Sequence, residues 1–159
     1  MVSNPDAMTT VLVVEDDPTV AELVRAVIND VPGWGAIVAY DAPSAATLLE
    51  HVRADVLVVD VMLPGTTGIE LLAGLRTRAN WHEPPVIVMS ANVSSQAVER
   101  ALGYDPSIQF LAKPFDIDDM VMSITRALEA RRVTQETEDR SEGQPDQPRA
   151  RQSQEARAS

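Results

Sequence analysis

Four short stretches of the sequence carry side chains that can bind a metal ion or the oxygens of a phosphoryl group. They are the acidic run at 15–17, Asp60, the hydroxyl of Ser90 and the ammonium of Lys113. Adjacent carboxylates raise one another's pKa unless a cation neutralises them. Oxygen ligands that leave room for several waters suit Mg²⁺. These residue types therefore favour a magnesium site with a fixed ammonium beside it.

Phosphoryl transfer is the chemistry that such a set can support. It needs a nucleophile in line with the phosphorus, a metal on the transferring oxygens and fixed donors for the remaining charge. Asp60 can be the nucleophile, because carboxylates form aspartyl phosphates. Asp16, with Glu15 acting through water, would hold the metal. Ser90 and Lys113 would then bind the other phosphoryl oxygens.

Each of these groups directly follows a short apolar run rich in β-branched residues. Because the runs are continuously hydrophobic and do not alternate with polar residues, they are typical of strands that are covered on both faces of a parallel sheet. The five runs are 11–14, 37–40, 56–59, 86–89 and 110–112.

Segments with apolar residues at helical spacing lie between and after these strands, at 20–28, 45–52, 69–75, 94–102 and 117–128. The fourth has only Val98, Ala101 and Leu102 as apolar anchors, so we expect it to be the least firmly docked. Strict alternation of five strands and five helices predicts an open, doubly wound α/β sheet, with ligands beyond the carboxyl ends of its strands. Asp17, Asp41 and Asp116 are expected to cap helices.

The composition excludes several functional classes. The 159 residues have a net charge of −11, no cysteine, and two histidines far apart in sequence. A disulfide framework, a thiolate nucleophile and a zinc–thiolate site are therefore excluded, and the acidity argues against nucleic acid as a partner. No apolar run approaches the roughly 18 residues of a membrane span, and the first residues do not resemble a signal peptide. We expect a cytoplasmic protein without a membrane partner.

Charge and hydrophobicity divide the chain unevenly. Residues 8–130 hold 17 acidic and 7 basic side chains, whereas residues 131–159 hold six of each. The last stretch has almost nothing apolar to bury against its ordering entropy. We therefore expect an N-terminal extension at 1–8, one domain at 9–132 and a disordered tail at 133–159, without an attached output domain.

The motifs at 13–18, 60–65, 90–91 and 113–115 resemble the receiver domain of two-component response regulators, and of chemotaxis regulators in particular. Four separated motifs occur in the right order, with 44 residues from Asp16 to Asp60 and 30 from Asp60 to Ser90. The resemblance covers roughly residues 9–130. It implies a flavodoxin-like sheet with strand order 2-1-3-4-5.

The resemblance also implies a role for each residue of the site. Asp60 would be the phosphoacceptor, and the Mg²⁺ ligands would be Glu15, Asp16, Asp60 and the backbone carbonyl of Met62. The phosphate-binding and switch residues would be Ser90, Ala91, Lys113 and Phe110. The side chains at positions flanking the attacking water, which could tune the lifetime of the phosphoryl group, would be Met62 and Asn92.

The function implied is that of a Mg²⁺-dependent phosphoacceptor switch, which assists its own phosphorylation but is not an enzyme in the usual sense. A histidine kinase or a histidine phosphotransfer protein would supply the phosphoryl group. The signal would pass to a protein partner through the fourth helix, the fifth strand and the fifth helix. A phosphorylation-independent binding module with the same fold is the alternative. Thr67 and the loop at 103–107 depart from the common family pattern.

Overall fold

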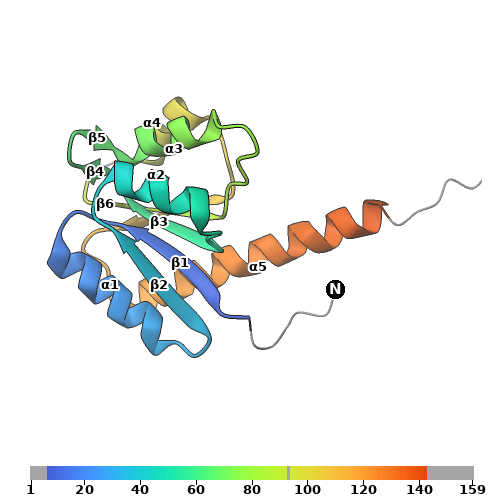
Figure 1. Ribbon diagram of the computed structural model, residues 1–159, viewed down its shortest axis with the longest axis horizontal. Helices are drawn as coiled ribbons and strands as arrows, with labels where there is room; N and C mark the ends of the chain where they lie inside the picture. The colour runs from blue at the N-terminus through green and yellow to red at the C-terminus, as the bar shows by residue number, and fades with distance from the viewer. Residues whose placement is uncertain (1–6, 93, 143–159) are drawn as a thin grey trace, which may run out of the picture.

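A computed structural model describes residues 7–92 and 94–142 of the chain. Five strands form a single parallel sheet in the order β2-β1-β3-β6-β7 (Figure 1). They are β1 (Thr9–Val14), β2 (Trp34–Ala39), β3 (Val56–Asp60), β6 (Val86–Ser90) and β7 (Ile108–Ala112). With these five strands counted along the chain, the order is 2-1-3-4-5, so the predicted flavodoxin-like sheet is confirmed.

Five helices cover the two faces of this sheet. Helices α1 (Pro18–Asp30) and α5 (Ile117–Glu142) lie on one face, and α2 (Ala42–His51), α3 (Gly68–Arg76) and α4 (Ser95–Leu102) lie on the other (Figure 1). Alternate strand residues supply the two cores, because successive side chains in a strand point to opposite faces. Val11 and Val13 pack in the first core, and Leu12 and Val14 in the second. Strand sequences that are hydrophobic throughout are thereby explained.

The three predicted helix caps are present. Asp17 Oδ1 accepts a hydrogen bond from the Thr19 amide at 2.8 Å, and Asp41 Oδ1 accepts one from the Ser44 amide at 2.7 Å. Asp116 Oδ1 accepts from the amide of Asp119 at 2.9 Å. Each carboxylate satisfies an amide that has no partner within its helix.

A small hairpin, which was not predicted from the sequence, lies between β3 and α3. Strands β4 (Met62–Leu63) and β5 (Thr66–Thr67) pair antiparallel. Two-residue strands are too short to produce a periodic hydrophobic pattern, which is why they escape sequence reasoning. Thr67, which departs from the family pattern, is the N-cap of α3 and forms a capping box with Glu70.

Helix α4 is thinly packed, as predicted, although one expected anchor is wrong. Val98 is only 2% exposed and Leu102 is partly buried against the same core. Ala101, in contrast, is exposed. The N-cap residue, Ser94, makes no side-chain hydrogen bond to the helix.

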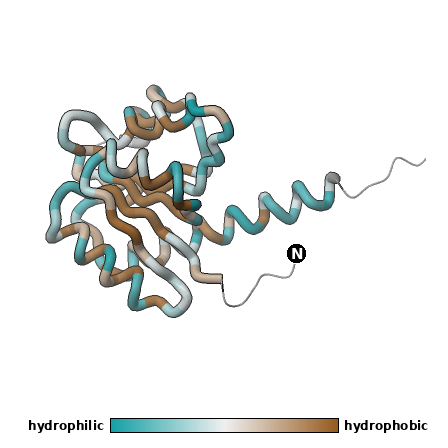
Figure 2. Tube along the Cα trace, viewed as in Figure 1, coloured by the Kyte–Doolittle hydropathy of each residue, from teal (hydrophilic) through white to brown (hydrophobic). Residues whose placement is uncertain are grey.

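Helix α5 is longer than the sequence analysis predicts. It runs through Glu142 and projects beyond the body of the domain (Figure 1), so the disordered tail expected from residue 133 does not begin there. Extending an existing helix is easier than nucleating one, and Arg132, Glu136 and Arg140 alternate in charge at helical spacing. The projecting turns are largely hydrophilic (Figure 2). Residues 143–159 and most of the expected N-terminal extension lie outside the described residues.

Within the part of the chain that the structure describes, no helix combines the length and hydrophobicity needed to cross a bilayer.

Candidate functional site

The carboxyl ends of four neighbouring strands bring the predicted site residues together. Glu15 continues the β1 ladder, since its amide donates to the Ala39 carbonyl at 3.0 Å. Asp60 is the last residue of β3 and pairs in register with Met89, next to Ser90 at the end of β6. The amide of Lys113 donates to the carbonyl of Ser90 at 2.8 Å. Side chains from segments far apart in the sequence therefore lie together at the carboxyl ends of these strands.

Three carboxylates meet at these strand ends. Glu15, Asp16 and Asp60 each offer an oxygen within 4.8 Å of the others, and they are the one such group of possible metal ligands within residues 7–92 and 94–142. Glu15 is 1% exposed and Asp60 is 5% exposed, whereas Asp16 is open to solvent. The cluster thus has two buried acids and one at its mouth.

Lys113 bridges the two buried acids. Its Nζ lies 2.7 Å from Glu15 Oε2 and 2.5 Å from Asp60 Oδ2. Burial disfavours the lysine's charged form, but the hydrogen bonds and charges of Asp60 and Glu15 outweigh it and raise the pKa of Lys113 above 10.5. Burial raises the pKa of Glu15, against the opposing effects of Lys113 and the Asp17 amide. The ammonium therefore compensates only part of the negative charge in the cluster.

The carboxylate of Asp60 is held at both oxygens. Oδ2 accepts from Lys113, and Oδ1 accepts from the backbone amide of Met62 at 2.9 Å. On the other side of Asp60, the backbone of Gly68 packs against it. A Cβ on Gly68 would come closer than 3.0 Å to the Asp60 carbonyl oxygen and the Val59 side chain. The first residue of α3 must therefore be glycine for the helix to lie this close to β3.

Gly68 was not predicted from the sequence to be a positioning residue. The amide of Gly68 also donates to the carbonyl of Val61 at 2.8 Å, which fastens the helix start to the loop after Asp60. The pattern Thr67-Gly68 at the start of a helix was the available signal, because glycine is unfavourable within a helix unless its small size is needed.

The remaining predicted residues surround the carboxylates at different depths. Ser90 is 9% exposed, and its Oγ accepts from the amide of Asn92 at 3.1 Å. Ala91 and Asn92 are exposed beside it. Met62 is 70% exposed at the rim, and Phe110 is 40% exposed on the edge strand β7. The structure thus groups Ser90 and Lys113 with the strand ends and leaves Phe110 on the outer surface.

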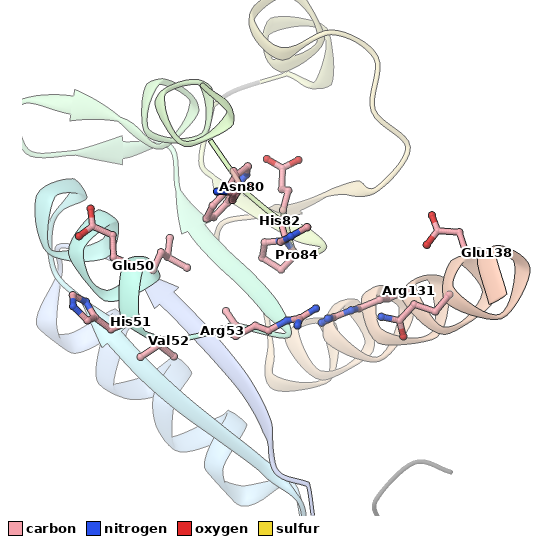
Figure 3. A pocket seen from close by; sticks show the side chains of 14 residues that line it. Glu50, His51, Val52, Arg53, Asn80, His82, Pro84, Arg131 and Glu138 are labelled. Carbon is pink, nitrogen blue, oxygen red and sulfur yellow. The ribbon is translucent and has the colours of Figure 1, made fainter. Parts of the chain in front are cut away.

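A cavity of about 640 Å³ lies at the opposite end of the sheet, near the amino ends of β3 and β6. It is formed by the end of α2, the segment before β6 and the outer turns of α5 (Figure 3). His51, Arg53, His82, Arg131 and Glu138 are among its lining residues. Glu15, Asp16 and Asp60 do not line this cavity, so the candidate site is identified by the converging strand-end residues and not by the cavity.

Comparison with known proteins agrees with this fold. Residues 11–125 match the response regulator receiver domain. The probable transcriptional regulatory protein TcrX of Mycobacterium tuberculosis is 34% identical over 129 residues, covering 79% of this chain and 52% of TcrX. The transcriptional regulatory protein CpxR of Escherichia coli K12 is 31% identical over 139 residues, covering 87% of this chain and 57% of CpxR. The chain therefore spans about half the length of these curated relatives.

Two solved structures match the domain over nearly their whole length. The receiver domain of the Francisella response regulator 1452 aligns with a TM-score of 0.66 and 32% identity, over 77% of this chain and 98% of that one. The chemotaxis response regulator CheY4 of Vibrio cholerae aligns with a TM-score of 0.67 and 25% identity, over 76% and 99% of the two chains. Because the family match extends from β1 into α5 and the same fold recurs in these solved domains, the chain belongs to the response regulator receiver domain family of two-component systems.

Proposed function

We propose that this domain is a phosphoacceptor switch in which Asp60 takes up the phosphoryl group. The observation that carries the proposal is the setting of the Asp60 carboxylate, which is buried, bound by Lys113 at 2.5 Å and grouped with two further carboxylates. A purely structural aspartate would not need a cluster of unbalanced negative charge beside it. A site for a cation and a phosphoryl group explains both the acids and the lysine.

In the proposed reaction, one carboxylate oxygen of Asp60 attacks phosphorus. The new P–O bond forms as the bond from phosphorus to the donor breaks, and the electron pair leaves with the donor, which is the imidazole nitrogen of a phosphohistidine. The bonds from the Met62 amide and Lys113 fix the orientation of the carboxylate before the donor arrives. Pre-set orientation lowers the barrier because the ordering of the nucleophile is complete before the reaction begins.

The donor set fits Mg²⁺, since the grouped atoms are all carboxylate oxygens and the exposed Asp16 leaves the mouth open to water. Glu15, Asp16, Asp60 and the carbonyl of Met62 would hold the ion. When bound, it supplies the positive charge that lets two acids and a phosphoryl group share one small site.

Lys113 and Ser90 would bind the oxygens of the transferred group. Lys113 reaches the acids from the end of β7, so a phosphoryl group on Asp60 would offer it new oxygens. The Ser90 hydroxyl can donate to a phosphoryl oxygen, and the small side chain of Ala91 leaves space beside it. Met62 and Asn92, both exposed, would influence how readily water reaches the phosphoryl group.

A histidine kinase or a histidine phosphotransfer protein would be the donor. For the outgoing signal we propose the surface formed by α4, β7 and α5, where β7 is the outermost strand. Large apolar side chains are exposed in this part of the chain, with Tyr104 80%, Phe110 40% and Met122 50% accessible. Phosphorylation would change this surface through Ser90 and α4, and a partner protein would read the change.

The test is phosphorylation of the full chain with acetyl phosphate, followed by intact mass. We expect wild type to gain one phosphoryl group only when Mg²⁺ is present, and Asp60→Asn to gain none. Asp30→Asn, which alters an exposed aspartate at the end of α1, should behave like wild type. Uptake by Asp60→Asn at the wild-type level would refute the assignment of Asp60.

A further inference from the structure

Arg76, at the end of α3, joins this helix to the segment before β6 and to the end of α4 with the loop that follows it. Its guanidinium binds Glu83 in a two-pronged pair, with Nε at 2.8 Å and Nη2 at 2.6 Å from the carboxylate oxygens. Nη2 also lies 2.6 Å from Asp105 Oδ2, and Nη1 donates to the backbone carbonyl of Leu102 at 3.1 Å. Leu102 is the last residue of α4 and Asp105 lies in the loop that follows. One side chain therefore holds the end of α4 to the body of the domain.

This network is partly shielded from solvent, and one guanidinium is shared by two carboxylates. The side chains of Arg76, Glu83 and Asp105 are 26%, 18% and 24% exposed. The Glu83 hydrogen bonds raise the pKa of Arg76 further, although partial burial opposes this. Asp105 is itself fixed, because its Oδ1 accepts from the Ser107 amide at 2.9 Å and from the Ser107 hydroxyl at 2.6 Å. A charged fork with three separate acceptors cannot be replaced by the single ammonium of lysine.

The two ends of α4 are therefore held very differently. At the C-terminal end, the Arg76 network is joined by the bond from the Gly103 amide to Glu99 O at 2.8 Å. At the N-terminal end, Ser94 makes no side-chain cap, and Val98 is the one buried residue of the helix among those whose burial is described. This loosely held end is the one that follows Ser90, the proposed phosphate-sensing hydroxyl.

We propose that Arg76 is a positioning residue that fixes the C-terminal end of α4 as a pivot, so that phosphorylation displaces mainly the N-terminal end of this helix. The pivot itself is a property of the resting domain. The second half of the proposal rests on the proposed function, because it needs a phosphoryl group on Asp60. The departure of the loop at 103–107 from the family pattern then has a purpose, since this loop supplies the Asp105 that completes the network.

Amide hydrogen exchange of the unphosphorylated full chain tests the pivot. In Arg76→Gln we expect the amides of residues 102–108 to exchange about tenfold faster than in wild type, because loss of the charged contacts favours local opening. Arg76→Lys should fall between the two, and Asp105→Asn should reproduce part of the effect without touching α3. Unchanged exchange at 102–108 in both Arg76→Gln and Asp105→Asn would overturn the proposal.

Arg78→Gln is the matched control. Arg78 lies two residues further along the chain, but its guanidinium pairs with Glu50 of α2 at 3.1 Å and makes no bond to α4 in the described part of the chain. We expect wild-type exchange at 102–108 in this variant. A general loosening of α4 in Arg78→Gln would show that any arginine here has the same effect, which would also overturn the assignment to Arg76.

The same measurement after treatment with acetyl phosphate and Mg²⁺ tests whether phosphorylation displaces mainly the N-terminal end of α4. In phosphorylated wild type, exchange should change at residues 95–98 and stay the same at 102–105, whereas in Arg76→Gln the change should reach both ends. An equal change at both ends in wild type would refute the pivot. If the intact mass shows no phosphoryl group, the proposed function fails, and so does the proposed displacement of the N-terminal end of α4. The pivot at Arg76 is still tested by amide exchange of the unphosphorylated protein.

Discussion

At the scale of single residues, the site is a compromise between stability and chemistry. Glu15 and Asp60 are both buried, and one ammonium lies between them. A buried carboxylate is unfavourable unless it is fully paired. The raised pKa of Glu15, caused first by its burial, indicates that this acid is not fully compensated. The site thus holds an excess of negative charge that a cation would relieve.

We therefore predict that Glu15→Gln stabilises the metal-free domain near neutral pH. A raised pKa means that the folded state holds the proton more tightly than the unfolded chain, so this contribution to stability is present below about 4.5 and is lost as pH rises through the folded pKa. The gain in Glu15→Gln should shrink as pH falls toward 4.5. Urea unfolding with a chelator, across this pH range, measures it. A variant less stable than wild type at neutral pH would contradict the prediction.

Gly68 provides a sharper prediction, because the chain contains a matched glycine in the same helix. Gly68→Ala places a Cβ against the Asp60 carbonyl and should destabilise the domain by about 1–3 kcal/mol while slowing phosphorylation. Gly74 has nothing within 4 Å of the same added atom, so Gly74→Ala should stabilise by about 0.5–1 kcal/mol. Urea unfolding and acetyl phosphate uptake measure both. Equal effects of the two substitutions would show that Gly68 has no special contact.

The sequence predicts which functional residues follow the strands, but it does not predict which residues fix those side chains in position. Glu15, Asp16 and Asp60 could be expected to meet, because each follows a strand of one parallel sheet, and they do. Gly68 was not predicted because its role depends on close contact between two backbone segments, which leaves no pattern of side chains in the sequence. The roles assigned to Ser90, Lys113 and the other site residues remain predictions.

At the scale of elements, the unevenly held helix α4 is the feature with consequences. Its C-terminal end depends on Arg76, whose partners lie 7, 26 and 29 residues away. Such contacts leave no periodic trace in the sequence, so the network was not predictable. Two other elements were not predicted for related reasons. The strands β4 and β5 are too short, and the outer turns of α5 are too polar, to show an apolar pattern.

Asp105 gives the α4 network a pH dependence that can be measured. Burial alone would raise its pKa, but the bonds from Ser107 and the charge of Arg76 outweigh this and lower the pKa below 3.8. A lowered pKa contributes stability above the ordinary value, and the contribution is lost as pH falls through the folded pKa.

Asp105→Asn should therefore be less stable than wild type by about 1–2 kcal/mol near pH 7. The difference should vanish as pH drops below 3.8. Urea unfolding of both proteins over this range is the measurement, with Asp30→Asn as an exposed control. A difference that persists unchanged in acid would assign the effect to packing and not to charge.

At the scale of the whole molecule, negative charge is both general and local. The chain has a net charge of −11, and within residues 7–92 and 94–142 three acids gather at the carboxyl ends of the strands. Any salt screens the general repulsion, whereas only a cation that fits the three carboxylates relieves the local one. The two effects should therefore be separable by experiment.

We predict that Mg²⁺ stabilises the domain beyond what ionic strength explains. At ten times its dissociation constant, Mg²⁺ should raise the free energy of unfolding by about 1.4 kcal/mol, because it binds the folded state alone. Thermal unfolding should show this as a rise of about 3–6 °C. NaCl at the same ionic strength should give a smaller rise. Asp16→Asn removes the exposed ligand without disturbing the core, so it should keep the response to NaCl and lose the extra response to Mg²⁺. If NaCl reproduces the whole shift, or if Asp16→Asn keeps it, the carboxylate group is not a magnesium site and the acids must be explained by another cation or by the partner protein.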